Sequence, residues 1–276
     1  MRQFYLLNGN GARFDLMSSQ GFFHAPSGLG FDKTQTYLRT GDFYKSIESY
    51  TSQKNVTGEM IFKSYADFHA FALFIASTPL KLIYKPMDVE YRMDCTVSSF
   101  GKTEIDHENN RLICPITFVG ESKWYYLRSA LSAHPGGDDA KKYTYKYNYT
   151  YYDALTGVID IINDSPIEAP CVLYIRGYCV NPSWVLSVNN EQISSGKITA
   201  EILDGNQIVV NSRDDALEIA EYTNQNVFIQ NLYPQADITR ENFLYIPPGT
   251  SKLTLTDDSM SDITAYLEIF EEYDTI

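Results

Sequence analysis

Long apolar runs are missing from this sequence of 276 residues. A membrane-spanning helix needs roughly 20 consecutive apolar residues, and no stretch comes near that length. The first residues, Met1–Asn8, hold only a short apolar run before Gly9, so they lack the hydrophobic region of a secretory signal peptide. We therefore expect no association with a membrane, and synthesis and assembly in a cytosol.

Cysteine and histidine are scarce, with four residues of each. No cysteine belongs to a C-x-x-C pair and each lies in an apolar, strand-like segment, which favours buried reduced thiols over disulfides or metal ligands. The cysteines are Cys95, Cys114, Cys171 and Cys179. The histidines, which form no metal-binding pattern, are His24, His69, His107 and His134. We predict no metal site and no cofactor.

Catalytic motifs are also missing. The G-x-S-x-G motif, which places a nucleophilic serine on a sharp turn, is absent. Gly9–Gly11 and Gly28–Gly30 lack the third glycine and the Lys-Ser/Thr pair of a phosphate loop, so they are predicted to be turns. The carboxylate pairs Asp214-Asp215, Asp257-Asp258 and Glu271-Glu272 are expected in loops or near the chain end, as solvated surface charge. We assign no catalytic residue and predict that the protein is not an enzyme.

Positive charge is in short supply in one half of the chain. Residues 1–137 carry 14 Lys and Arg against 13 Asp and Glu, a net charge of +1; residues 138–276 carry 8 against 22, a net charge of −14. This balance argues against specific nucleic-acid binding. Two interpretations of the acidic half remain open. It provides a soluble, self-repelling surface, or it stays in water while the neutral half packs against neighbouring proteins.

Aromatic residues, by contrast, are plentiful, with 22 Tyr and 15 Phe, which favours β-structure. The charged Pro/Gly segment 135–142 is predicted to be a linker between domains 1–134 and 143–276. The first domain is predicted to be a β domain with one docked helix, 64–78. Ser64 is its expected N-cap, and its apolar face is formed by Phe68, Phe71, Ala72 and Ile75, with Pro79 beyond its end.

The strands expected around that helix are 58–63, 80–85, 91–100 and 111–119, the last two joined by a charged turn at 106–110. The second domain is predicted to be all β, a sandwich of the jelly-roll type. Its expected strands are 143–152, 157–162, 170–178, 184–188, 197–202, 207–211, 226–232, 252–256 and 263–272. The tyrosines at alternate positions from 143 to 151 predict one all-Tyr strand face, which we interpret as a packed inter-domain or inter-subunit surface.

Exposed aromatic side chains raise an alternative function, carbohydrate binding through the second domain. Tyr152, Trp184 or Tyr233 could stack against a sugar ring. For Trp184, packing in the core is the favoured interpretation, because it lies within the apolar segment 182–186.

The order of these elements resembles the distal tail proteins of long non-contractile-tailed bacteriophages, over nearly the whole chain. In the N-terminal half the resemblance rests on Leu7-Asn8-Gly9, Phe14-Asp15-Leu16, 26–30, 58–62 with Tyr65 and Phe68, 102–105, 112–118 and 122–125. In the C-terminal half it rests on 149–151, 161–165, Ala169-Pro170, 175–177, 181–184 and 243–251.

The resemblance implies a structural protein of a phage or prophage tail tip, or baseplate, made in the bacterial host cytoplasm and assembled into the virion. It implies a homo-hexameric ring, formed by the first domain, that joins the tail tube protein to the tail-tip hub protein. The second domain would be a galectin-like or carbohydrate-module-like sandwich that carries receptor-binding proteins. This chain shows none of the inserted sugar-binding modules of some relatives, which favours the ring protein over the carbohydrate-binding alternative.

Overall fold

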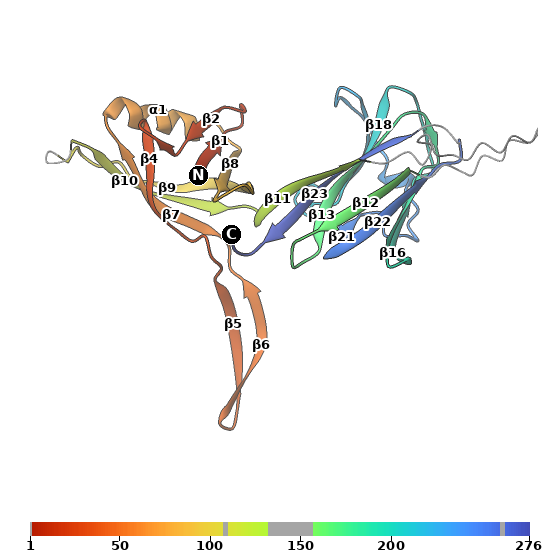
Figure 1. Ribbon diagram of the computed structural model, residues 1–276, viewed down its shortest axis with the longest axis horizontal. Coiled ribbons are helices and arrows are strands. Elements are labelled where there is room, and N and C mark those ends of the chain that lie inside the picture. Colours follow the sequence, from red (N-terminus) through yellow and green to blue (C-terminus); the bar gives the residue numbers. More distant parts are fainter. Residues whose placement is uncertain (1, 107–109, 132–156, 260–262) are drawn as a thin grey trace, which may run out of the picture. The chain divides into compact units, whose positions relative to one another are not determined.

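A computed structural model of the protein describes residues 2–106, 110–131, 157–259 and 263–276. These residues are mainly antiparallel β-strands with a single α-helix, which confirms the predicted fold class. They divide into two compact units, one of Met1–Tyr126 with Glu272–Ile276 and one of Leu127–Glu271 (Figure 1). Each unit has its own hydrophobic core. The predicted linker 135–142 and the Tyr stripe at 143–151 lie outside the described residues.

The first unit is built on one antiparallel sheet. Its elements are β1 (Gln3–Leu7), β2 (Arg13–Asp15), β3 (Met17–Ser18), β4 (Gly21–Ser27), β5 (Lys33–Thr40), β6 (Phe43–Thr51), β7 (Asn55–Phe62), α1 (Tyr65–Ile75), β8 (Leu80–Lys85), β9 (Tyr91–Phe100), β10 (Leu112–Gly120) and the start of β11 (Trp124–Leu131). The sheet runs in the order β3-β4-β7-β10-β9-β8-β1-β2. The strands β5 and β6 form a separate two-stranded sheet.

The helix α1 begins where the sequence predicts. The Ser64 side chain accepts a hydrogen bond from the backbone N–H of Asp67 at 3.2 Å, and its hydroxyl donates to the Asp67 carboxylate at 2.7 Å. The helix ends at Ile75, three residues before the predicted end, where the Ser77 N–H donates to the Phe74 carbonyl three residues back instead of to the carbonyl four residues back. The residue before a proline is also disfavoured in the helical conformation, and Pro79 follows closely.

Aromatic packing fixes α1 on the sheet. The fully buried Phe71 ring lies 5.6 Å from the Phe62 ring of β7 and 5.3 Å from the Phe100 ring of β9, and the Phe68 ring stacks on Phe100 at 4.9 Å. Burying a side chain of this size contributes about 1.5–3 kcal/mol. The predicted apolar face therefore does dock on the sheet, with Phe71 at its centre.

The second unit is a sandwich of two antiparallel sheets. Its elements are β12 (Gly157–Asn163), β13 (Ala169–Arg176), β14 (Cys179–Val180), β15 (Ser183–Val188), β16 (Glu191–Lys197), β17 (Glu201–Ile202), β18 (Asn206–Asn211), β19 (Glu218–Thr223), β20 (Phe228–Asn231), the 3-10 turn η1 (Tyr233–Gln235), β21 (Tyr245–Ile246), β22 (Gly249–Thr256) and β23 (Thr264–Tyr273). One sheet runs β20-β19-β18-β13-β23 and the other β12-β22-β15-β16. Trp184 of one sheet and Leu173 of the other lie in the same core.

The chain crosses between the two units within strands. One crossing falls at Tyr126–Leu127, inside β11, and the other at Glu271–Glu272, inside β23. The described residues thus change unit before residue 134, where the sequence places the end of the first domain, and the last five residues return to the first unit. Sequence patterns miss this return because the strand pattern of residues 263–272 continues through the crossing.

Candidate assembly surfaces

The hairpin formed by β5 and β6, here called the arm, is exposed along nearly its whole length. Every residue of β5 and all but the last residue of β6 are exposed. Its large apolar side chains include Phe43, which is 81% exposed. The others are Tyr37, Leu38, Tyr44, Ile47 and Tyr50. Figure 1 shows the arm as two strands that leave the sheet of their own unit.

Both faces of the arm carry apolar side chains. Leu38 pairs with Lys45 and Thr40 with Phe43, so Leu38 and Phe43 share one face. Tyr37 and Tyr44 share the other, because side chains alternate along a strand. A two-residue turn at Gly41-Asp42, with Gly41 at φ +64°, closes the tip. A bulge between Thr36 and Tyr37 shifts the register.

The base of the arm is held much more firmly than its tip. Lys54 is only 7% exposed, and its ammonium group donates to the backbone carbonyls of Gly30 and Asp274. Burial lowers the pKa of this ammonium group. Thr51 donates to the Asp274 carboxylate at 3.2 Å. The end of the chain and the two strands that enter the arm are therefore joined at one point.

A hairpin of this kind is incomplete by itself. Two strands without a covered face are marginally stable in water, and clustered exposed apolar side chains mark interaction sites. The arm therefore combines a firmly held base with an uncovered apolar tip, which makes it the candidate assembly surface of the first unit.

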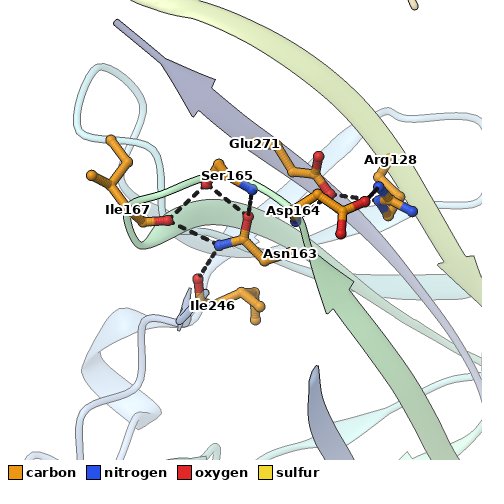
Figure 2. Close-up of polar contacts among 7 residues, drawn as sticks. All are labelled: Arg128, Asn163, Asp164, Ser165, Ile167, Ile246 and Glu271. Carbon is orange, nitrogen blue, oxygen red and sulfur yellow. Dashed lines mark hydrogen bonds and ion pairs between the residues drawn. The ribbon is translucent and has the colours of Figure 1, made fainter. Parts of the chain in front are cut away.

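In the second unit the Asn163 side chain links two loop regions by hydrogen bonds (Figure 2). The Asn163 side-chain amide donates to the backbone carbonyls of Ile167 at 3.0 Å and Ile246 at 2.8 Å. Its oxygen accepts from the backbone N–H and hydroxyl of Ser165 at 2.9 and 2.7 Å. This one side chain therefore joins the β12–β13 connection to β21, and two motifs that carry the resemblance, 161–165 and 243–251, meet at a structural contact.

The Glu271 carboxylate corrects a prediction. The sequence places it among solvated charges, whereas its side chain is 1% exposed within β23 and accepts a 2.5 Å hydrogen bond from Arg128 (Figure 2). The same guanidinium pairs with Asp164. The hydrogen bond to Glu271 and the two carboxylates raise the pKa of Arg128. The carboxylate is thus held in a structural ion pair.

The structure also places most of the other residues that the sequence singles out. Trp184 is fully buried, which confirms its place in the core and removes it as a sugar platform, whereas Tyr233 is exposed. All four cysteines are free and buried, and His69 is exposed, as predicted. Tyr152, His107 and His134 lie outside the described residues. Within the described ranges no group of three or more His, Cys, Asp or Glu side chains could hold a metal ion, and no helix is long and apolar enough to span a membrane.

A second apolar surface lies on the sandwich. Two adjoining hollows, with volumes of about 600 and 470 Å³, are both lined by Tyr233 and Phe243. The Tyr233 and Phe243 rings stack with centroids 6.3 Å apart and an interplanar angle of 22°. We call this surface the sandwich groove. Sequence patterns give no signal for it, because its residues come from β16, β19, β20, η1, β21 and the connections before β13, β19 and β21.

The described residues form a two-unit β protein with exposed apolar side chains on the arm and in the sandwich groove. Residues 3–120 match the family profile described as the distal tail protein, N-terminal domain. Over these residues, which make up less than half of the chain, the protein is similar to the N-terminal domain of distal tail proteins.

Solved structures have a similar fold along the whole chain. A chain in the structure of the phage P2 baseplate in its activated conformation with Ca aligns with a TM-score of 0.68 at 18% identity, with 100% of both chains covered. The crystal structure of SPP1 Dit aligns with a TM-score of 0.65 at 8% identity, with 98% of this chain and 99% of that chain covered. At these identities the likeness concerns the fold. No curated protein matches the sequence.

Proposed function

We propose that this protein forms a homo-hexameric ring at the end of a phage tail, between the tail tube protein and the tail-tip hub protein, and that the arm makes the contact between neighbouring copies. The observation that carries the proposal is the arm itself. Its side chains, such as Leu38 and Phe43, are exposed on a hairpin that has no core of its own. A neighbouring copy would supply the missing cover.

The charge of the arm fits contact between identical copies. Its strands and their flanks carry three basic residues, Lys33, Arg39 and Lys45, and three acidic residues, Asp32, Asp42 and Glu48, a net charge of zero. Copies that meet through this segment experience no net repulsion. The apolar side chains on both faces suit a hairpin that lies between two surfaces rather than on one.

The acidic half of the chain suits a different task. Residues 138–276 carry a net charge of −14, so copies of this half repel one another and stay apart in water. We propose that the sandwich faces outward from the ring and carries receptor-binding proteins of the virion. The domains proposed for these two roles are the predicted 1–134 and 143–276.

The test is the mass of the full chain by light scattering across a concentration series. We expect the mass to rise from 31.4 kDa towards the hexamer. The double variant Leu38→Ser/Phe43→Ser should remain monomeric at concentrations where the native chain associates. The matched control is Leu73→Ser/Met87→Ser, which replaces two exposed apolar residues elsewhere in the first unit and should associate normally.

A second experiment asks what the arm touches. A photoreactive benzoylphenylalanine at Phe43 should give a ladder of cross-linked multiples of the chain, whereas the same group at Met87 should not. A ladder that is equally strong from Met87, or cross-links from Phe43 to another tail protein alone, would contradict the arm as the contact between copies.

A further inference from the structure

We propose that the sandwich groove docks a segment of another protein in which an aromatic or aliphatic anchor is flanked by Lys or Arg. The inference rests on the proposed function, since it identifies the kind of partner that the sandwich would carry. It concerns the surface around Tyr233 and Phe243, which belongs to the second unit, whereas the arm belongs to the first.

Apolar side chains line the groove and none of the described residues covers them fully. Ile193 of β16, Ile238 and Tyr245 line one hollow, and Leu217 and Phe228 line the other. Ile238 is 90% exposed and Tyr233 is 55% exposed. Fully desolvated aromatic and aliphatic anchors that fill such hollows supply most of the binding energy at protein interfaces.

The groove is preformed. The Asn242 side chain accepts a hydrogen bond from Lys197 N–H at 3.1 Å and donates to the backbone carbonyls of Asp237 at 2.8 Å and Arg240 at 3.2 Å. These bonds hold the wall that carries Ile238 and Phe243 against β16. A groove that needs no ordering on binding loses less free energy when a partner docks.

Charge selects the partner. The side chains that line the groove include three carboxylates, Glu168, Glu218 and Glu241, and one guanidinium, Arg240. Arg240 is already paired with Asp237 at 3.1 Å, and Glu168 and Glu241 have no ion-pair partner within the part of the chain that the structure describes. A basic segment complements this rim, and an acidic one is repelled.

The neighbouring backbone favours a peptide over a sugar. Strand β20, which contributes Phe228 to the groove, is an edge strand whose four residues are all exposed. Its only strand partner among the described residues is β19. An edge of this kind offers backbone donors and acceptors to an extended segment, while the side chains of that segment enter adjacent hollows. The groove's main amide side chain, Asn242, is engaged in backbone bonds and is not directed to a ligand.

The experiment uses the full chain and a random library of 12-residue peptides. We expect selection to enrich peptides with an aromatic or aliphatic anchor and a net positive charge. Tyr233→Ala should weaken binding of the best peptide by at least tenfold, and Glu168→Lys/Glu241→Lys should weaken it by a similar factor. Ile162→Ser, which alters an exposed apolar residue on β12, at the other edge of the sheet from β16, is the matched control and should not change the affinity.

The outcomes separate this inference from the ring proposal. All groove variants should keep the mass of the native assembly. Loss of peptide binding in a groove variant with an unchanged mass therefore supports the groove proposal. Loss of the ring in an arm variant that still binds the peptide bears on the arm proposal alone. Failure to enrich any peptide, enrichment of acidic peptides, or affinity that Tyr233→Ala leaves unchanged would overturn the groove proposal. Saturable binding of a glycan on an array, lost in Tyr233→Ala, would also overturn it. So would peptide binding that is seen only when residues 138–156 are replaced by a Gly/Ser segment of equal length, since the occupant of the groove would then be this chain itself.

Discussion

The first unit contains two hairpins with very different surroundings. In the β9–β10 hairpin, residues of β10 alternate between buried and less buried positions, with Leu112, Cys114, Ile116 and Phe118 on the buried side. In the arm, the same antiparallel pairing is present, but no residue of either strand is buried. Backbone pairing is therefore common to both hairpins, and only the cover differs.

This difference separates the residues that stabilise the monomer from those available for contacts with other chains. The helix α1 covers β9 through Phe68 and Phe71, which stack or pack on Phe100. Nothing within the described chain plays that part for the arm. Covered strands stabilise the monomer, and uncovered apolar strands are available to stabilise contacts with other chains. Substitutions that act on the cover, the base or the tip should therefore have separable effects.

The largest effect should come from removal of the cover. We expect Phe71→Ala to lower the free energy of unfolding of the first unit by about 3–5 kcal/mol, because a fully buried aromatic side chain leaves a cavity. Denaturant unfolding of the full chain measures it. Leu73→Ala on the same helix, at a position that is 61% exposed, is the control and should cost less than about 1 kcal/mol. A loss below about 1 kcal/mol for Phe71→Ala would mean that the helix does not anchor the sheet.

The next effect should come from the base of the arm. Gly28 has φ +89°, and a Cβ atom there would lie 1.9 Å from the backbone oxygen of Asn55. We expect Gly28→Ala to cost about 1–3 kcal/mol from backbone strain, and more if Asn55 cannot move. Gly30→Ala, where a Cβ meets no atom within 4 Å, is the matched control. Equal stability of the two variants would show that the entry to the arm adapts freely.

The covered hairpin is also the one that sequence patterns predict well. Strand β9 coincides with the predicted 91–100, and β8 with the predicted 80–85, because alternating burial leaves an alternating pattern of side chains. The arm has no predicted strand. Its residues 33–51 place polar and apolar side chains on both faces, so the two-residue period that burial against this chain would impose is missing.

Elsewhere the limit of prediction is tertiary packing. The predicted strand 197–202 is wrong as one element: Lys197 ends β16, Ile198 then pairs with Ala236, and only Glu201–Ile202 form the next strand. Strand β16 itself is missed because its side chains are mainly polar. The same strand brings Gly196 against the Trp184 ring, where a Cβ atom would lie 2.2 Å away. The ion pair of Glu271 and the sandwich groove likewise depend on residues that are distant in the sequence.

A smaller effect on stability is expected at the tip of the arm. Phe43→Ser should change the free energy of unfolding of the dilute chain by less than about 0.5 kcal/mol, because Phe43 is 81% exposed and loses no contact in the core. The same variant should weaken self-association in light scattering. Phe118→Ser, on the covered hairpin, provides the contrast and should unfold the first unit far more readily. A strong loss of stability from Phe43→Ser would show that the tip packs within its own chain.

The smallest effect, near zero for the native protein, concerns thiol reactivity. Cys95 and Cys114 lie on the covered hairpin, and Cys171 and Cys179 lie in the core of the sandwich; all four are buried. Burial raises the pKa of Cys95 and of Cys179 to about 12, so at pH 8 the reactive thiolate is almost absent as well as inaccessible. A disulfide reagent should therefore label no thiol in the folded chain and four in denaturant.

Phe43→Cys should add one thiol that reacts at once in the dilute chain. If a neighbouring copy covers the arm, labelling of this thiol should slow as the protein concentration rises. A thiol at residue 43 that reacts equally fast at every concentration where the mass has increased would place the contact between copies away from the arm.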